Sequence, residues 1–304
     1  MAQRPTLAKD VPATWRRLRS KQTVSPHGLF MNKAAVAFLR YPGGKQRVLD
    51  WLLQYLPPRD DIQGRFVEPF VGGGAIFFAL NPRVSLLTDI NPELIDLYRG
   101  IRRYPDKVWD CFRSFPSSKK AYYRIRGMVR EELDLAENAA RTLYLNRTCF
   151  KGMWRHNSSG QFNVGYGGQD RRWTLGRECL RTIARRLRRA TLRCCHFEDS
   201  VAECTGEDFL FVDPPYQPGK LDLTHDHFAR FRFSYADHER LAKALRQVTK
   251  RSVRWAMTTT SHPDVLALFP GHNVVSLPRG PRTKLGRPAG ESGEVLVRNY
   301  EGVP

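Results

Sequence analysis

The pattern of apolar and polar residues predicts helices and strands in turn in the first third of the chain. In QRVLDWLLQYL, residues 46–56, apolar side chains recur at helical spacing, and a Pro-Pro pair ends the predicted helix. Apolar runs at 65–68 and 85–88 predict strands, with a VGGG turn and a helix start, AIFFAL, between them. Asn91 with a proline behind it is typical of a helix N-terminus. This order of elements predicts a βαβ unit of a doubly wound sheet.

The same sheet-like pattern returns near Thr191. The apolar run FLFV, residues 209–212, predicts a buried strand, and the two prolines after it cannot continue a ladder because neither has an N–H to donate. Helical spacing predicts a helix at 237–248, and EVLVRNY, residues 294–300, predicts a closing strand. Strand patterns therefore occupy two separated parts of the chain.

A helical and strongly basic stretch lies between these two parts. Within it, residues 171–193 contain nine arginines and one acid. The segments 153–156 and 161–164 flank Asn157-Ser158-Ser159-Gly160, a polar linker of hairpin length. The pattern thus predicts an α/β domain interrupted by a basic insertion. Residues 1–33 are basic and lack clear periodicity, so we expect them to form an arm.

Composition and charge indicate a folded protein with a polyanionic partner. The chain has 304 residues, of which 41% are hydrophobic, which is enough for a substantial core. Fifty Lys and Arg against thirty Asp and Glu give a net charge of +20, which favours nucleic acid as the partner, with an anionic membrane surface second. No apolar stretch is long enough to predict a spanning helix, and the first ten residues contain no apolar signal core. We therefore expect a cytoplasmic protein.

The six cysteines show no C-x-x-C pair and no zinc-like spacing with histidine. Disulfide frameworks belong to short secreted chains, so we expect reduced thiols and no metal.

The glycine turn does not fit either of the common nucleotide motifs. Gly72 and Gly74 could serve a dinucleotide, but Phe77 stands where a third glycine is needed. Gly44-Lys45 fails as a phosphate loop because Gln46 replaces the Ser or Thr. What remains is a turn that lets a ligand approach the backbone closely.

Acids flank this turn on both sides. Glu68 precedes it, and Asp89 ends the second predicted strand, where an acid can accept hydrogen bonds from ribose hydroxyls. In the alternative interpretation, Asp89 merely precedes the helix that Asn91 caps.

The motif DPPY, residues 213–216, follows the predicted strand FLFV. Asp213 Oδ and the carbonyl oxygen of Pro214, held by a stiff Pro-Pro backbone, can accept the two hydrogens of an adenine amine. Tyr216 offers a face on which the base can stack. The electrophile would be the sulfonium methyl of S-adenosylmethionine, held by the neighbouring glycine turn. A base in a duplex must be flipped out to reach such a pocket.

Six motifs together resemble one enzyme family. RYPGGK, FVEPFVGGGAIF, TDINPELI, YLNRTCFKGMWRHNSSGQFNVGYG, DPPY and GEVLVRNY occur in the order of the Dam-like, alpha-class DNA adenine methyltransferases, over residues 38–300. The resemblance implies a Rossmann-like methyltransferase fold, with a doubly wound, mostly parallel sheet and an antiparallel C-terminal strand. It also implies that residues 34–95 and 190–304 form the S-adenosylmethionine-binding catalytic domain. Residues 96–189 would be an inserted, mainly helical target-recognition domain containing a β-hairpin.

The resemblance assigns roles to individual residues. The catalytic residues are expected to be Asp213, Pro214, Pro215 and Tyr216. The cofactor-binding residues are expected to be Tyr41, Pro42, Gly43, Gly44, Lys45, Glu68, Pro69, Phe70, Gly72, Gly74, Asp89, Ile90, Phe197 and Asp213, with the cofactor adenine between Ile90 and Phe197. The expected contacts to double-stranded DNA are Arg147, Phe150, Lys151, Met153, Trp154, Arg155 and Asn163.

Some of these assignments leave alternatives open. Phe197 can be an ordinary core aromatic, and Trp154 can pack the hairpin instead of meeting DNA. The arginine-rich helix near 177–193 is expected to face phosphates rather than only solvent. No obligate protein partner is inferred.

Three positions depart from the family pattern. Lys151 stands where relatives usually have asparagine, Gly165 where they usually have proline, and Gly168 where GATC-specific members carry arginine. A changed base-reading side chain alters discrimination by about 1–3 kcal/mol per contact, so GATC is not assumed as the target. Rival hypotheses are the same chemistry on cytosine or RNA, and a catalytically silent DNA-binding protein with this fold.

Overall fold

The computed structural model describes residues 38–41, 43–157, 159–168, 172, 175–215, 233–278 and 291–301. The predicted arm at 1–33, Pro42 and Tyr216 lie outside the described residues. Among the residues that are described, no helix is both long enough and apolar enough to cross a membrane.

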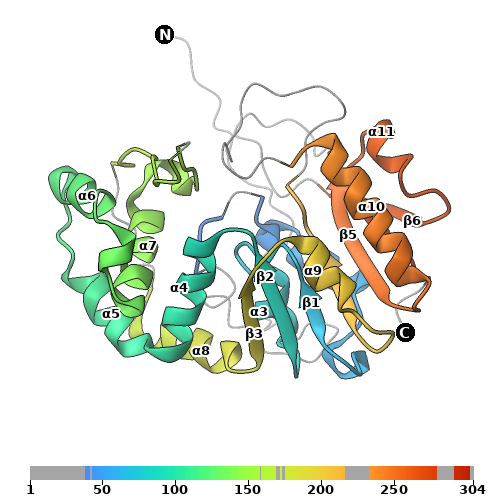
Figure 1. Ribbon diagram of the computed structural model, residues 1–304, viewed down its shortest axis with the longest axis horizontal. Helices are drawn as coiled ribbons and strands as arrows, with labels where there is room; N and C mark the ends of the chain where they lie inside the picture. The colour runs from blue at the N-terminus through green and yellow to red at the C-terminus, as the bar shows by residue number, and fades with distance from the viewer. Residues whose placement is uncertain are drawn as a thin grey trace, which may run out of the picture. The chain divides into compact units, whose positions relative to one another are not determined.

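A mostly parallel sheet forms the centre of the described fold (Figure 1). Its seven strands have the order β3-β2-β1-β4-β5-β7-β6 within the described part of the chain. The strands are β1 Phe66–Glu68, β2 Ser85–Asp89, β3 Ala190–Cys194, β4 Phe209–Val212, β5 Arg254–Thr260, β6 Asn273–Pro278 and β7 Glu291–Arg298. β7 runs antiparallel to both β5 and β6, whereas the other pairs are parallel. The predicted fold class, including the antiparallel C-terminal strand, is confirmed.

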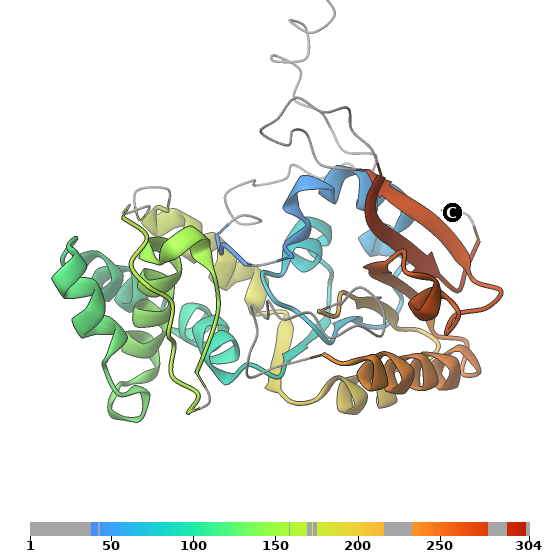
Figure 2. The same cartoon turned by 90° about the horizontal axis from the view of Figure 1, so that it is seen from above.

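Helices cover both faces of this sheet. Figure 2 shows the orange α10 on one side and the blue α2 and cyan α3 on the other. The helices are α2 Leu49–Leu52, α3 Ala75–Leu80, α4 Pro92–Arg103, α5 Pro105–Ser114, α6 Lys119–Arg126, α7 Leu135–Thr148, α8 Arg177–Leu187, α9 Phe197–Ala202, α10 Tyr235–Thr249 and α11 Pro263–Leu266. α4 packs on β2 and β3 and also on α7, so it joins the sheet to the predominantly helical stretch predicted between residues 96 and 190. The division into catalytic and target-recognition domains stays a prediction.

The predicted βαβ unit is present with its cap. The predicted strands correspond to β1 and β2, and AIFFAL forms α3. The side chain of Asn91 accepts a hydrogen bond from the Glu93 N–H at 3.1 Å, and Pro92 occupies the first position of α4. This unit therefore forms because local capping chemistry and the apolar pattern favour the same structure.

One predicted helix is wrong in detail. Residues 46–56 do not form a continuous helix but a 3₁₀ turn at Lys45–Arg47, the short α2, and a second 3₁₀ turn at Leu53–Tyr55. Apolar spacing correctly identified the buried side chains, including Leu49, Leu52 and Leu53. Packing of these side chains does not require an unbroken helical backbone, because 3₁₀ turns place i and i+3 side chains on one face.

The core lies along β1 and β4, whose residues are buried on both faces. Such strands are apolar without alternation because helices cover both sides of a parallel sheet. The rings of Phe66 and Phe209 stack with centroids 6.4 Å apart across the β1–β4 pair.

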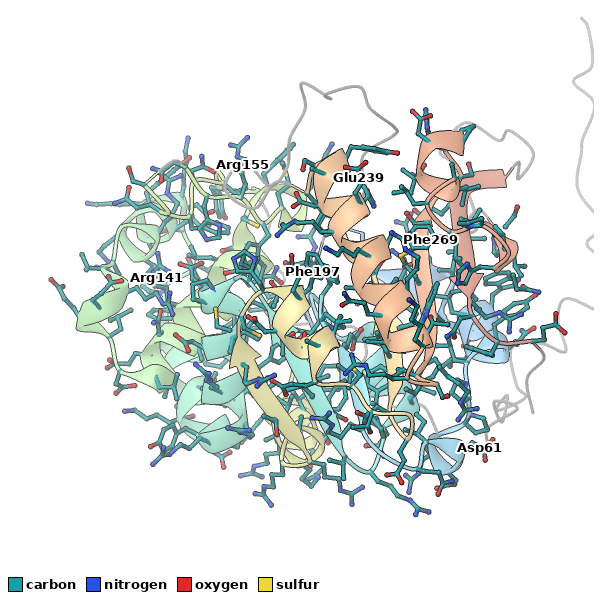
Figure 3. The ribbon with its side chains drawn as sticks, turned by 45° about the vertical axis from the view of Figure 1, so that its right-hand side comes forward. Asp61, Arg141, Arg155, Phe197, Glu239 and Phe269 are labelled. Carbon is teal, nitrogen blue, oxygen red and sulfur yellow. The ribbon has the colours of Figure 1, made fainter. Side chains whose placement is uncertain are left out.

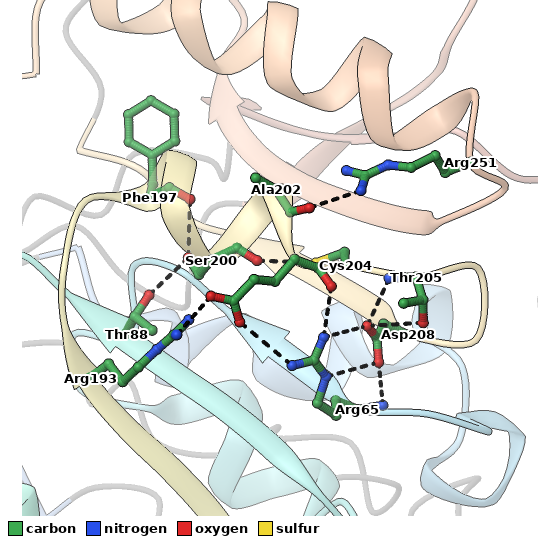
Figure 4. A network of polar contacts seen from close by, with 11 residues as sticks. Arg65, Thr88, Arg193, Phe197, Ser200, Ala202, Cys204, Thr205, Asp208 and Arg251 are labelled. Carbon is green, nitrogen blue, oxygen red and sulfur yellow. Dashed lines mark hydrogen bonds and ion pairs between the residues drawn. The ribbon is translucent and has the colours of Figure 1, made fainter.

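A polar network fixes the amino ends of β1 and β4 (Figure 4). The backbone N–H of Arg65 donates to Asp208 Oδ1 at 2.6 Å, and its guanidinium donates to Asp208 Oδ2 at 2.9 Å. Glu203 extends the network by accepting a hydrogen bond from Arg193 at 2.7 Å. Because these bonds join the residues just before β1 and β4, they fix how far each strand reaches at its carboxyl end.

Candidate active site

Three acidic residues meet at one edge of the sheet. Glu68 is the last residue of β1, Asp89 is the last residue of β2, and Asp213 directly follows β4. β1 pairs in parallel with both β2 and β4, so the carboxyl ends of all three strands open at the same edge. The connection after β1 leads to β2 on one side, whereas the connection after β4 leads to β5 on the other side. Ligands bind at such a reversal of strand order in doubly wound sheets.

The glycine turn between β1 and α3 has a left-handed backbone, and the side chain closest to Gly72 is the Tyr41 ring. The predicted close approach of a ligand to this turn stays a prediction. Gly72 and Gly74 have φ angles of 45° and 64°, in the left-handed region that favours glycine. A Cβ at Gly72 would lie 3.0 Å from the Tyr41 ring, so a side chain there would displace that ring. The Tyr98 hydroxyl donates to the Gly72 carbonyl at 2.7 Å and fixes the turn from beneath.

Asp89 is tied to this turn through the backbone. Its Oδ2 accepts from the Gly72 N–H at 3.1 Å, and its Oδ1 accepts from the Asn91 N–H at 3.0 Å. Burial raises the pKa of Asp89 to about 6, although these backbone donors act in the opposite direction. Asp89 therefore both precedes the helix that Asn91 caps and accepts a hydrogen bond from the glycine turn.

Glu68 is a buried acid with an unused oxygen. Its side chain is only 3% exposed, and among the described residues no hydrogen-bond partner reaches Oε2. Burial and the neighbouring charges of Asp213 and Asp89 raise the pKa of Glu68 well above its ordinary value. A buried carboxyl that has an oxygen without a partner among the described residues is costly, so it indicates a binding function rather than a contribution to stability.

Asp213 is held by two donors on one oxygen. Lys45 Nζ lies 2.7 Å from Asp213 Oδ1, and Thr258 Oγ1 donates to the same atom at 2.5 Å. Lys45 also donates to the Gly43 carbonyl at 2.9 Å and lies 3.9 Å from Glu294. Lys45 of the YPGGK motif and Asp213 of the DPPY motif therefore form an ion pair in which Lys45 is buried and Asp213 is half-buried. Sequence reasoning missed Thr258, because TTT in a strand carries no signal that one hydroxyl faces an acid.

Phe197 and Ile90, the two residues predicted to contact the adenine of the cofactor, lie in different environments. Phe197 is 6% exposed at the start of α9 (Figure 3), with its ring 5.4 Å from Phe70 and 5.9 Å from Phe233. Phe197 thus packs as a core aromatic. Its neighbour Phe70 belongs to the segment that leads into the glycine turn. Ile90 is 39% exposed, directly after Asp89. Thr88 Oγ1 contacts the Pro69 carbonyl at 3.4 Å, which joins β2 to the turn.

The predicted hairpin forms with sparse pairing. Bridges join Cys149 to Tyr166 and His156 to Phe162 in antiparallel fashion, without regular strands between them. Arg155 Nε donates to Asn163 Oδ1 at 2.9 Å, so two of the predicted DNA contacts bond to each other across the hairpin. Figure 3 shows Arg155 at the outer surface of this region.

The start of the hairpin presents two exposed residues of the predicted DNA-binding set. Phe150 is 47% exposed, and Lys151 is exposed with a φ of 53°. The Lys151 ammonium lies 5.1 Å from the centroid of the Phe150 ring. Met153 is half-buried.

Two other members of that set are buried. Arg147 is 5% exposed and donates to the Phe38 carbonyl. Trp154 is 2% exposed, and its ring centroid lies 5.4 Å from that of Tyr41 and 6.5 Å from that of Phe162. The hairpin therefore packs directly on the residue that contacts the glycine turn.

A buried ionic cluster that the sequence did not indicate makes a second link. Glu93 in α4 lies 2.9 Å from His156 Nε2 in the hairpin and 3.4 Å from Arg141 Nη1 in α7. Burial alone would raise the pKa of Glu93, but the His156 hydrogen bond and the nearby arginines lower it. Arg141 is labelled in Figure 3, where it lies among the helices beside the sheet.

No cluster of His, Cys, Asp and Glu within the described residues could hold a metal ion, and all six cysteines are free thiols. The sheet order, the glycine turn and the acids at the strand ends agree with the Rossmann-like methyltransferase class that the motifs predict.

Comparison with known proteins defines the family. The family described as D12 class N6 adenine-specific DNA methyltransferase matches residues 41–276. The chain is 31% identical over 273 residues to a type II methyltransferase of Lactococcus lactis subsp. cremoris, an alignment spanning 86% of this chain and 95% of that relative. It is 32% identical over 220 residues to a DNA adenine methylase of Serratia marcescens, spanning 71% and 80%. The chain therefore belongs to the D12 class of N6 adenine-specific DNA methyltransferases and is an enzyme of this type.

The buried position of Trp154 predicts a structural effect of its removal. Trp154→Ala should lower the free energy of unfolding by about 3–5 kcal/mol, because a large ring packed on Tyr41 and Phe162 would leave a cavity. Urea unfolding measures this change, and Phe150→Ala, at an exposed position, is the control that should change it little. Unchanged stability of Trp154→Ala, combined with weaker DNA binding, would instead support the direct DNA contact.

Proposed function

We propose that the enzyme transfers the methyl group of S-adenosylmethionine to the 6-amino group of an adenine flipped out of double-stranded DNA. The observation that carries this proposal is the cluster of Glu68, Asp89 and Asp213 at one sheet edge, with Lys45 as a buried cation beside it. Such a cluster favours a cationic ligand that also presents hydroxyl groups. S-adenosylmethionine has this chemistry, and when bound it supplies an electrophilic sulfonium methyl group.

The residues of the site fit such a ligand. Glu68 Oε2, which lacks a partner among the described residues, can accept a hydrogen bond from an ammonium group. Asp89 can accept hydrogen bonds from ribose hydroxyls while its backbone partners keep it in place. The left-handed glycines allow the tight turn that brings the backbone beside Asp89. The assignment of Phe197 and Ile90 to the adenine of the cofactor remains part of the proposal.

Asp213 would act on the target amine by accepting its hydrogen bonds. Lys45 and Thr258 both contact Oδ1, which fixes the carboxylate plane and directs Oδ2 as a second acceptor. The Pro214 carbonyl would accept the other amine hydrogen, and the Pro-Pro backbone restricts its direction. Together these acceptors favour a pyramidal nitrogen whose lone pair is available for attack. Stacking of the base on Tyr216 belongs to the same proposal, although Tyr216 lies outside the described residues.

The hairpin would contact the duplex through its exposed residues. Phe150 and Lys151 lie at its start, where an aromatic wedge and a cation can meet the gap left by the base. Gly168 has a φ of 74° and no side chain with which to read a base. The recognition sequence is therefore not assigned to GATC. DNA binding alone does not require a buried acid, Glu68, beside the Lys45–Asp213 pair, so this arrangement favours catalysis over a silent DNA-binding protein.

The direct test removes the proposed catalytic carboxylate. Asp213→Ala should reduce methyl transfer to duplex DNA by at least about 100-fold, because the amine loses its principal acceptor, while DNA affinity changes little. Transfer of labelled methyl groups and a filter-binding assay measure the two quantities, and a nucleoside digest identifies the product as N6-methyladenine. Loss of DNA binding together with activity would count against the assigned role.

The raised pKa of Asp89 predicts pH-dependent cofactor binding. The ionised carboxylate accepts hydroxyl hydrogen bonds, so affinity should be full above pH 6 and fall by up to about tenfold per pH unit below it. Calorimetric titration with S-adenosylmethionine from pH 5 to pH 8 measures this dependence. Glu68 titrates in the same site, so Asp89→Asn serves as the comparison and should bind weakly without the transition near pH 6. The same transition in both proteins would assign it to another group.

The contact with Thr258 predicts a positioning role. Thr258→Val should lower kcat by about tenfold with little change in KM, since it removes one hydrogen bond to the Asp213 carboxylate. Thr258→Ser should restore most of the rate. The neighbouring Thr259 provides a matched control, because its buried hydroxyl has no partner among the described residues and Thr259→Val should leave kcat unchanged. Equal losses in the two valine variants would indicate a general disturbance of β5.

A further inference from the structure

Helix α6 carries an unusual concentration of positive charge. Its eight residues, KKAYYRIR, include four basic side chains and no acid. Lys119, Lys120, Tyr123 and Arg124 are exposed, and their i, i+4 spacing puts them on one side of the helix. Lys119 and Lys120 also occupy the first turn, where the helix dipole disfavours positive charge. Local helix stability therefore does not explain these residues.

Carboxylates of the described residues do not neutralise the exposed basic side chains of α6. Among the described residues, no carboxylate forms an ion pair with Lys119, Lys120 or Arg124. Tyr123 is 40% exposed, and the Arg126 guanidinium lies 4.8 Å from the centre of its ring. An exposed aromatic ring beside unpaired cations is typical of a surface that contacts a nucleic acid backbone.

The other basic helix, α8, has the opposite environment. Arg181 lies 2.9 Å from Asp106 of α5, and Arg185 lies 2.9 Å from Glu178. Arg177 contacts both Asp106 and Asp110. The exposed arginines of α8 thus already have carboxylate partners, which weakens their attraction for phosphate. The larger number of arginines in residues 171–193 does not make α8 the better DNA-binding surface.

Helix α6 is also hydrogen-bonded to the hairpin. The Tyr122 hydroxyl donates to the Val164 carbonyl at 2.8 Å, and Arg126 donates to the same oxygen at 3.1 Å. Arg141 donates to the Ile125 carbonyl at 3.1 Å and so fixes the last turn of α6 near Glu93 and His156. Figure 1 shows α6 and the segment after α7 at the same end of the helical layer.

We infer that Lys119, Lys120, Tyr123 and Arg124 of α6 form a second DNA-contact surface, which binds phosphates of the duplex that flanks the target base. This inference rests on the proposed action on double-stranded DNA and extends it beyond the hairpin. Phosphate contacts of this kind add affinity and fix orientation without reading sequence. The surface therefore contributes to the salt dependence of binding and not to base discrimination.

The test compares two variants that remove equal charge. Lys119→Ala, Lys120→Ala and Arg124→Ala are combined in one protein, and Arg177→Ala, Arg181→Ala and Arg185→Ala in another. Binding to a 30-base-pair duplex is measured between 50 and 300 mM salt. The slope of log K against log salt should decrease by about 0.9 for each lost α6 contact and stay unchanged for the α8 variant. Methyl transfer by the wild-type protein to the same duplex is measured separately, so failure of the proposed chemistry can be distinguished from failure of this inference.

Several outcomes would overturn the inference. The first is an unchanged salt slope for the α6 variant, and the second is an equal decrease of the slope for the α8 variant. The third is a decreased slope in a variant that keeps the charge, with Lys119→Arg, Lys120→Arg and Arg124→Lys combined. Loss of binding to phosphatidylserine vesicles with an unchanged DNA slope would assign the surface to a membrane instead. If the triple α6 variant does not fold, Lys120→Gln alone should decrease the slope by about 0.9, and no decrease would contradict the inference.

Discussion

The parallel pairing of β1 with β2 on one side and β4 on the other is the constraint on which the site depends. Each strand is short, and each ends at or just before an acid: Glu68, Asp89 and Asp213. A shift of one residue in either register would move an acid from the edge and place its side chain on the other face of the sheet. The Arg65–Asp208 network at the opposite ends of β1 and β4 resists such a shift. The geometry of the three acids therefore depends on contacts at the amino ends of these strands.

Bringing three acids together has an electrostatic cost that the protein only partly offsets. Lys45 neutralises one carboxylate, and backbone N–H groups stabilise Asp89, whereas Glu68 keeps a buried oxygen without a partner in the described chain. The pKa values of Glu68 and Asp89 are both raised, so the ligand-free site favours partial protonation. A cationic ligand reverses this preference, since it stabilises the ionised carboxylates that it contacts. The site is thus unfavourable alone and favourable when filled, as expected for a binding site rather than a stabilising cluster.

The sequence allowed much of this site to be predicted because strand ends, glycine turns and caps are local features. The cap at Asn91, the left-handed glycines at 72 and 74, and the strand before DPPY all follow from adjacent residues. β5 and β6 were not predicted, and neither was the contact of Thr258 with Asp213, which joins residues 45 positions apart. The sequence also contained no sign that Arg177 and Arg181 of α8 are paired, because their partners on α5 are about 70 positions away. Ion pairs between residues distant in sequence decide which basic side chains remain available to bind DNA. The composition of a segment does not show these ion pairs.

The hairpin and the glycine turn are mechanically connected by two independent contacts. Trp154 packs on Tyr41, and the Tyr41 ring limits the space at Gly72. His156 pairs with Glu93 in the first turn of α4, the helix that Asn91 caps. Both contacts are buried, where side chains have few alternative positions. A displacement of Tyr41 must therefore be accommodated by Trp154, and a change in the ionic cluster alters the support of the hairpin at His156. The same residues that hold the hairpin in place also border the proposed cofactor site, so the proposed binding of DNA and of cofactor would share one set of packed side chains.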